Sequence, residues 1–260
     1  MLLALDVGNT QIYGGVFDGG TLKLGFRRTS KGQAASDELG VFFKAALREN
    51  GVDPAAITEV AICSVVPELI YPLVQASAKY FRAEPFVLQA GIKTGLNLKY
   101  KNPQEIGADR IANAIAAVSM FPGRDLVIVD LGTATTFCAV SAAKEYLGGV
   151  IMPGLRLSME ALSSGTAKLP RVEIARPPAI VGKTTVEGIQ SGLYNGNLFA
   201  IKGIVAGIKA DHFGGGALVI GTGGFSKLFE GAGVFDHVVP DLVLQGIAEA
   251  VKLSKEKKTK

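Results

Sequence analysis

Two short acidic turns carry the first chemical signal in the sequence. Asp6-Val7-Gly8-Asn9-Thr10 follows an apolar run that begins at Leu2, and Asp130-Leu131-Gly132-Thr133 follows one that begins at Leu126. A carboxylate at the end of a buried strand costs free energy unless a metal ion or hydrogen-bond donors compensate it. The glycine two residues later lets the backbone turn with its N–H groups exposed, and such groups hold phosphate oxygens. The two turns therefore predict a site that grips one phosphorylated ligand.

The repetition strengthens this interpretation. One such turn alone is weak support, because many hairpins share its composition. Here two copies lie about half the chain apart, each between two apolar strands. We therefore expect a tandem duplication of one α/β module, with an interdomain cleft between the copies.

A third polar segment, from Tyr100 to Arg110, contains a second kind of chemistry. Asp109 and Arg110 stand where a loop enters a helix of small apolar residues. The functional interpretation makes Asp109 a general base that takes the proton of a substrate hydroxyl during phosphoryl transfer. Arg110 would then bind a substrate oxygen through its planar fork of donors. The alternative is structural, with Asp109 stabilising the helix dipole and Arg110 lying in solvent.

Two glycine-containing segments fail to complete known nucleotide motifs. Gly182-Lys183-Thr184 lacks the upstream strand of a P-loop, and position 177 is a proline where that loop needs glycine. Gly221-Thr222-Gly223-Gly224 follows a strand, but Ser226 interrupts the dinucleotide fingerprint. A glycine turn still lets a flat ring approach the backbone, so a contact with adenine or ribose is possible there.

The remaining polar candidates are weaker. Thr184 and Thr185 stand at the start of a long helical stretch, where helix capping is the alternative to a substrate contact. His212 and His237 are isolated and have no metal-ligand spacing, so we expect both to be structural or surface residues.

The apolar periodicity predicts the elements that must position these residues, in the order β-β-β-α-β-α-β-α in each half. In the first half the predicted strands are 2–7, 11–17, 21–28, 60–65 and 85–88, and the helices are 36–50 with Ser36 as its cap, 67–80 and 108–120, with a loop from 91 to 106. In the second half the strands are 125–130, 135–140, 146–151, 218–221 and 238–239, and the helices follow Gly154 and span 185–209, 225–230 and 242–253. The predicted domains are 1–122 and 123–260, the last helix being free to pack back on the first domain.

Composition limits the class of protein. Of 260 residues, 48% are hydrophobic and 19% charged, which is enough to bury a sizeable core. The net charge is +4, and much of the excess lies in the tail after Lys252, which we expect to be solvated and not a nucleic-acid arm. Apolar runs are too short to span a bilayer, so no membrane partner is expected. Cys63 and Cys138 lie in apolar strands and predict reduced thiols in a soluble, cytoplasmic protein.

Together the motifs resemble one family, the type III pantothenate kinases, over nearly the whole chain. That family belongs to the superfamily of acetate and sugar kinases, heat-shock chaperones and actin. The matching segments are 6–10, 95–97 through Tyr100, 102–103, 107–110, 130–136, 148–154 and 222–224. The resemblance implies two tandem RNase H-like (actin-like ATPase) domains. It also implies a homodimer that uses ATP to phosphorylate the primary hydroxyl of pantothenate to 4'-phosphopantothenate, the first step of coenzyme A biosynthesis.

The resemblance also implies roles for individual residues. The ATP phosphates would lie along Asp6, Val7, Gly8, Asn9, Thr10, Gln11, Ile12 and Tyr13, and Thr133 would touch ATP. Pantothenate would be bound by Tyr100, Gly107, Ala108, Asp109, Arg110 and Thr185, with Asp109 as the proton acceptor. Asp6 would help to organise a divalent cation such as magnesium. Asp130 would bind a monovalent cation, potassium or ammonium.

One departure and two alternatives remain. Relatives often have asparagine where this chain has Thr184, which leaves open whether Thr184 or Thr185 faces the substrate. The same fold also occurs in ATP-binding switch proteins and in regulatory proteins without small-molecule kinase activity. No basic recognition helix is visible, which argues against direct DNA contact.

Overall fold

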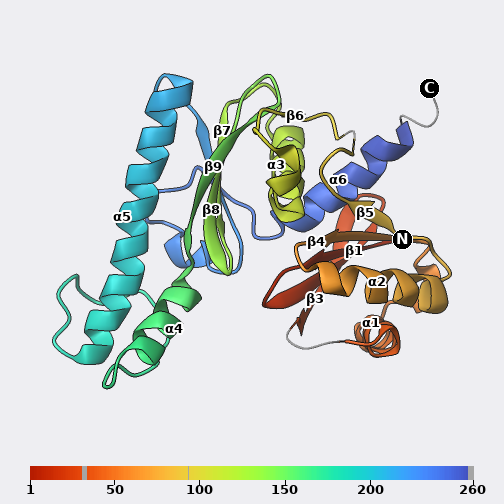
Figure 1. Ribbon diagram of the computed structural model, residues 1–260, viewed down its shortest axis with the longest axis horizontal. Coiled ribbons are helices and arrows are strands. Elements are labelled where there is room, and N and C mark those ends of the chain that lie inside the picture. The colour runs from red at the N-terminus through yellow and green to blue at the C-terminus, as the bar shows by residue number, and fades with distance from the viewer. Residues whose placement is uncertain (31–33, 93, 257–260) are drawn as a thin grey trace. The chain divides into compact units, whose positions relative to one another are not determined.

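The computed structural model describes residues 1–30, 34–92 and 94–256 (Figure 1). These residues form two compact units, which we describe separately. Unit 1 contains the described residues of Met1–Leu96, Tyr100–Met120 and Leu242–Lys260, and unit 2 contains Asn97–Lys99 and Phe121–Asp241. The end of the basic tail that we expect to be solvated, residues 257–260, lies outside the described part of the chain.

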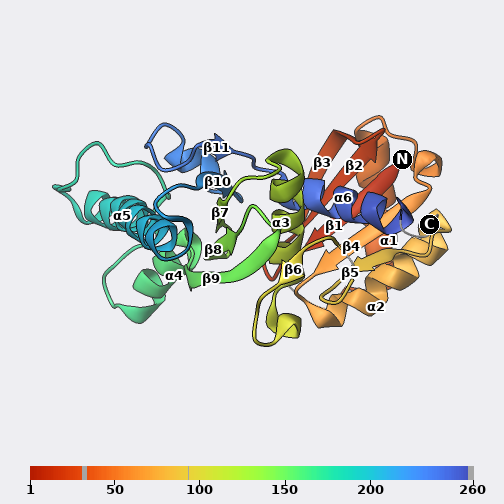
Figure 2. The same ribbon diagram turned by 90° about the horizontal axis from the view of Figure 1, so that it is seen from above.

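The sheet of unit 1 is built around β1 (Leu2–Val7), whose apolar side chains are almost completely buried. Its strand order is β3-β2-β1-β4-β5, with β2 at Gln11–Asp18, β3 at Thr21–Thr29, β4 at Glu59–Ser64 and β5 at Phe86–Leu88 (Figure 2). The three N-terminal strands are antiparallel, whereas β1, β4 and β5 run parallel. Consequently the carboxyl ends of β1 and β4 meet at the same edge of the sheet.

One face of this sheet is covered by α1 (Ser36–Glu49) and α2 (Pro67–Ala76). Apolar side chains of both helices pack with those of β1, β2 and β4 in one core. The predicted cap of α1 is wrong, because Ala35 is the N-cap, makes no side-chain cap hydrogen bond, and is followed by Ser36 as the first helical residue. The predicted helix from Pro67 continues after α2 as one π-helical segment, Ser77–Phe81.

Two helices distant in sequence, α3 (Ala108–Met120) and α6 (Leu242–Glu256), also belong to unit 1. They cross closely, since a Cβ atom at Gly246 would collide with the backbone carbonyl of Ala112. Small residues on α3 make this approach possible. The predicted division into residues 1–122 and 123–260 stays a prediction, and α6 joins the first of the two compact units.

The sheet of unit 2 repeats the topology of unit 1. Its order is β11-β10-β7-β8-β9-β6, with β7 at Leu126–Leu131, β8 at Ala134–Val140, β9 at Glu145–Pro153, β10 at Leu218–Thr222, β11 at His237–Val238 and β6 at Asn97–Leu98. Without β6, the order β9-β8-β7-β10-β11 matches β3-β2-β1-β4-β5, with the same strand senses. The predicted α/β duplication is confirmed. The prediction of a loop at 91–106 is wrong at β6, a two-residue strand that pairs with β9.

Helices α4 (Leu155–Gly165) and α5 (Thr185–Phe213) follow one another between β9 and β10. The core of unit 2 joins apolar side chains of α5 to those of β7. The predicted short helix after β10 is a 3-10 helix, η4, at Ser226–Phe229. None of the helices in the described residues is long and apolar enough to cross a membrane.

Candidate active site

The first acidic turn is built as the sequence predicts. Asp6 lies near the end of β1 and is half-buried, and the Gly8 N–H donates to the carbonyl of Gln11 at 3.0 Å to close the turn. Asn9 and Gln11 are exposed, so their side chains can reach a ligand. Val7 and Ile12 are fully buried in the core, so only their backbone groups could serve the predicted ATP contact.

Asp6 stands in a row of residues that runs across the sheet. In the strand registers it pairs with Tyr13 of β2 on one side and with Cys63 of β4 on the other, and Tyr13 pairs in turn with Arg27 of β3. Directly paired residues share one face of a sheet. Cys63 and Arg27 had no functional role in the sequence analysis. Their signal was the strand order β3-β2-β1-β4, which only the folded sheet reveals.

Asp109 lies in the first turn of α3, within the same unit. Its Oδ1 atom accepts the backbone N–H of Arg110 at 2.8 Å. A Cβ atom at Gly107 would collide with this oxygen, so the glycine leaves room for the carboxylate. Burial raises the pKa of Asp109 above its usual value, against the lowering effect of the Arg110 backbone hydrogen bond and charge. A carboxylate with a raised pKa is a stronger base and suits proton abstraction from a hydroxyl.

Cys63 lies near two carboxylates of this unit, those of Asp6 and Asp109. Its thiol is completely buried and free of a disulfide. Burial, followed by the negative charges of Asp6 and Asp109, raises the pKa of Cys63 well above its usual value. The thiol therefore stays neutral, and both carboxylates lie near enough to act on it. The sequence prediction that Cys63 and Cys138 are buried and form no disulfide is confirmed.

Arg110 and Tyr100 belong to the same unit. The guanidinium-bearing Arg110 is only 6% exposed, which excludes the alternative that places this arginine in solvent. Tyr100 is half-buried just before η3 (Pro103–Glu105). Asn102 caps η3 by accepting the Gln104 N–H at 3.4 Å, so this asparagine has a structural role.

The second acidic turn lies in unit 2 and is more enclosed. Asp130 of β7 is half-buried and pairs in register with Thr136 and Thr222. Gly132 closes the turn by donating its N–H to the Ala134 carbonyl at 3.2 Å. Thr133 is half-buried at its tip.

Two glycines pack closely against the second acidic turn. Gly223 has φ of +85°, and a Cβ atom there would collide with the Asp130 carboxylate. Gly154 donates its N–H to the Thr133 carbonyl at 3.2 Å, and a Cβ atom at Gly154 would collide with that carbonyl. Gly223 therefore leaves room for the Asp130 carboxylate, and Gly154 leaves room for the carbonyl of Thr133 at the tip of the turn. Hard oxygen donors of this kind fit a hard cation.

The glycine segment after β10 is less open than predicted. A Cβ atom at Gly221 would lie within 2.5 Å of the Phe235 ring, so the chain's own aromatic ring covers that backbone. Gly223 packs against Asp130, and only Gly224 has nothing within 4 Å of its Cβ position. A contact with a flat ligand ring is therefore restricted to Gly224.

The two threonines at the start of α5, Thr184 and Thr185, have different roles. Thr184 is the N-cap, and its hydroxyl accepts the Glu187 N–H at 3.1 Å. Glu187 in turn accepts the N–H of Lys183, the residue before the cap, at 2.7 Å. Thr185 is exposed as the first helical residue, so of the two threonines it is the one whose hydroxyl the cap does not use.

Metal-ligating clusters do not add to this picture. Within the described residues, no group of three or more His, Cys, Asp or Glu side chains could hold a metal ion. His237 instead lies beside Phe121, with ring centroids 4.6 Å apart. A divalent cation would therefore need ligand oxygens as well as a single protein carboxylate, as is usual for magnesium in phosphoryl transfer.

Comparisons with solved structures show the fold. A Campylobacter jejuni protein, described provisionally as a Baf family transcriptional activator, is 19% identical, with a TM-score of 0.61 over 98% of this chain and 99% of that one. The activator of 2-hydroxyisocaproyl-CoA dehydratase from Clostridium difficile, solved with bound ADPNP, is 12% identical, with a TM-score of 0.53 over 99% of this chain and 97% of that one. These similarities and the repeated sheet order identify the actin-like ATPase fold.

Sequence comparisons show the family. Residues 2–207 match the family model described as type III pantothenate kinase. Proteins of that name from Legionella pneumophila (strain Corby) and Elusimicrobium minutum (strain Pei191) are 57% and 51% identical to this chain. The first alignment covers 98% of this chain and 99% of the relative, and the second covers 97% and 98%. The chain therefore belongs to the type III pantothenate kinase family.

Proposed function

We propose that this protein phosphorylates pantothenate with ATP, the first step of coenzyme A biosynthesis, and that Asp109 is the base. The family membership carries the choice of substrate. The observation that carries the chemistry is the half-buried Asp109 carboxylate, whose pKa is raised by desolvation and beside which Gly107 leaves room. In phosphoryl transfer the protein mainly positions the reactants and stabilises charge, and such a base takes the hydroxyl proton.

The protein's own groups divide the work. Asp109 accepts the proton of the primary hydroxyl of pantothenate, and Arg110 binds a substrate oxygen. Tyr100, Gly107, Ala108 and Thr185 complete the proposed pantothenate contacts. The backbone N–H groups and polar side chains from Asp6 to Tyr13 bind the ATP phosphates, and Thr133 contacts ATP. A divalent cation held by Asp6 and the phosphates would neutralise charge on the transferred group.

The test is a coupled ADP-release assay with pantothenate and a panel of sugars and short acids. We expect activity with pantothenate, and a drop in kcat on the order of 10²-fold or more in Asp109→Asn. ATP binding should be largely kept in this variant. Normal turnover of Asp109→Asn would remove the assigned base. Stoichiometric nucleotide binding with no phosphorylated product would favour an ATP-binding switch instead.

We also propose that Asp130 holds potassium or ammonium. The Asp130 carboxylate near the end of β7, with Gly223 packed against it, supports this role, because carboxylate oxygens are the hard donors that hard cations prefer. Replacing potassium by sodium should lower the rate, and Asp130→Asn should abolish the difference between the salts. Equal rates in potassium, ammonium and sodium would contradict the assignment.

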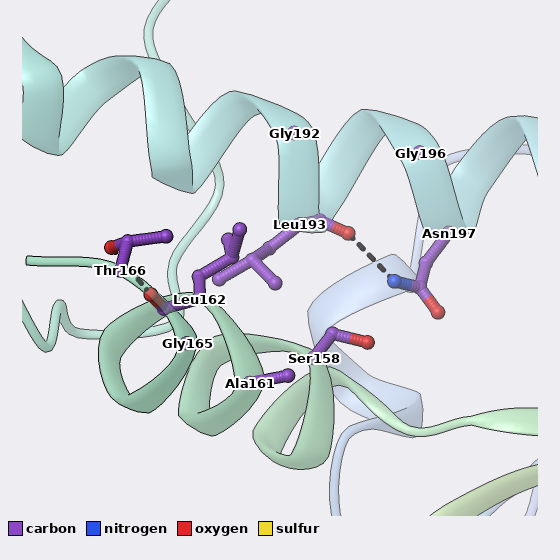
Figure 3. Close-up of a pocket in the computed structure, with 9 residues that line it drawn as sticks. All are labelled: Ser158, Ala161, Leu162, Gly165, Thr166, Gly192, Leu193, Gly196 and Asn197. Atoms are coloured by element: carbon purple, nitrogen blue, oxygen red, sulfur yellow. Dashed lines mark hydrogen bonds between the residues drawn. The ribbon is translucent and has the colours of Figure 1, made fainter. Parts of the chain in front are cut away.

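We also propose that the protein is a homodimer, and the support for this comes from unit 2. Helices α4 and α5 leave an open groove of about 410 Å³ lined by small residues from both helices, among them Ala161, Gly165, Gly192 and Gly196 (Figure 3). Large apolar side chains of the same two helices are exposed, namely Leu157, Leu162, Val186 and Phe199. A second copy of the chain would cover them. Sedimentation should report a dimer, which Gly192→Leu weakens, while a monomeric wild type would contradict the proposal.

A cytoplasmic location completes the proposed function. Two buried cysteines without a disulfide support it, since disulfides persist mainly in oxidising compartments. Fractionation of cells should recover the protein with the cytoplasmic enzymes.

A further inference from the structure

Arg27 of β3 holds a position that the proposed site does not use. It pairs in register with Tyr13, which pairs with Asp6, so the three residues lie in one row on one face of the sheet of unit 1. Strands β3, β2 and β1 lie side by side in Figure 2. Arg27 is exposed, so this row ends in a positive charge that a ligand can reach.

The Arg27 guanidinium lies over the ring of Tyr13. Its central carbon lies 3.7 Å from the centroid of the Tyr13 ring, within the range of a cation–π contact. The Tyr13 ring itself lies over β3, since a Cβ atom at Gly25 would be 3.3 Å from its hydroxyl oxygen. Stacking uses the flat face of the guanidinium and leaves its N–H donors pointing outward in the plane.

No carboxylate of the described residues lies within ion-pair distance of Arg27. Ion pairs do form elsewhere in this part of the chain, for example between Lys79 and Asp37. The neighbouring Arg28 lies in a different environment. It is half-buried on the opposite face of β3, lies 5.9 Å from the Phe42 ring centroid and donates to the Thr29 carbonyl.

The end of β3 is also tied to the first acidic turn. The Ser30 N–H donates to the carbonyl of Thr10 at 3.0 Å, three residues after Arg27 in the chain. The turn that offers backbone N–H groups to phosphate and the strand that carries Arg27 are therefore one connected structure. A planar guanidinium matches two oxygens of a phosphate group at once.

On this basis, and resting on the proposed kinase function, we propose that Arg27 binds phosphate oxygens of the nucleotide, with Tyr13 as the platform that orients it. Arg27 is thus a further ATP-binding residue. Tyr13 acts partly through Arg27. In this row the negative charge of Asp6 attracts the divalent cation, and the positive charge of Arg27 attracts the phosphates.

The test measures nucleotide binding by calorimetry without pantothenate. Arg27→Ala should bind ATP about tenfold to a hundredfold more weakly, because a charge-assisted pair of hydrogen bonds is lost, while adenosine binding stays unchanged. Arg27→Lys should recover only part of the affinity, since it keeps the charge but lacks the fork. Arg28→Ala is the matched control, because it removes the same charge from the opposite face and should leave ATP binding unchanged.

Three results would overturn the proposal. The first is an unchanged ATP affinity in Arg27→Ala. The second is an equal loss for adenosine, which would make Arg27 structural. The third is a rise confined to the KM of pantothenate that disappears with pantothenol, the alcohol that lacks the carboxylate, which would move Arg27 to that carboxylate. A wild-type protein that binds ATP but does not phosphorylate pantothenate would refute the proposed function and leave the Arg27 measurement intact.

Discussion

The two units carry equivalent rows of residues with different chemistry. Across unit 1 the row reads Cys63, Asp6, Tyr13 and Arg27, and at the same register positions of unit 2 it reads Thr222, Asp130, Thr136 and Ile151. The first row contains groups that titrate or carry charge, whereas the second has one carboxylate between two hydroxyls. The duplication therefore supplies the same scaffold twice, and the neighbours of each aspartate decide what the carboxylate can do.

The turns beside these two aspartates also differ, in how open each turn is to a ligand. In unit 1 the Gly8 N–H reaches Gln11, and Asn9 at the tip is exposed. In unit 2 the Gly132 N–H reaches only Ala134, and Gly223 packs directly on the carboxylate of Asp130. The first turn is open to a flexible chain of phosphates. The second is a compact cradle, which suits a bare cation better.

The largest effect that would test this contrast comes from one methyl group placed beside each carboxylate. Gly223→Ala places it against Asp130 and against the backbone of Leu131, at a residue with φ of +85°. Because the backbone cannot yield, we expect a loss of stability of roughly 2–4 kcal/mol. Each kcal/mol lowers Tm by about 2–4 °C in a chain of this size class, which thermal unfolding measures.

In unit 1, Gly107→Ala places the methyl group against the end of the Asp109 side chain, which can rotate away. Stability should therefore stay within about 1 kcal/mol, while kcat falls about tenfold to a hundredfold because the base is displaced. Gly203→Ala on α5 is the control, since its Cβ position is open. If Gly107→Ala lost stability and kept kcat, the two carboxylates would not differ as we argue.

The pH dependence of the rate sharpens the same comparison. Burial raises the pKa of Asp109, and a general base acts only when deprotonated. The rate kcat/KM should therefore fall as the pH drops through this raised pKa, at a higher pH than the value of about 3.9 for an ordinary aspartate. Asp130→Asn should keep this acid limb. An acid limb at the ordinary aspartate value would show that Asp109 does not set it.

Much of the fold follows from local pattern. The strands on either side of both acidic turns were predicted within one or two residues, because apolar alternation and glycine turns leave little choice. The two-residue strand β6 escaped prediction, since its pairing with β9 comes from distant sequence. The cap of α1 failed for a related reason, because Ser36 has the right chemistry but the helix begins one residue earlier than a Ser36 cap requires.

The site was predictable only in part. Asp6 and Asp130 could be singled out because a carboxylate at the end of an apolar strand is unusual. Asp109 could be singled out because it stands beside an arginine where a polar segment enters a helix of small apolar residues. Cys63 and Arg27 could not, since a cysteine in an apolar strand and an arginine on an edge strand are ordinary by themselves. Their importance comes from the sheet order β3-β2-β1-β4, which places four separate segments in one row.

The smallest predicted effect separates the two threonines before α5. Thr184→Ala removes the hydroxyl that accepts the Glu187 N–H, and losing an N-cap costs about 1 kcal/mol. Thermal unfolding should show the loss, with the KM of pantothenate nearly unchanged. Thr185→Ala should do the reverse, because the exposed Thr185 hydroxyl plays no part in the cap. If Thr184→Ala raised that KM and kept its Tm, the capping threonine would be the one that faces the substrate, and the start of α5 would have to open when pantothenate binds.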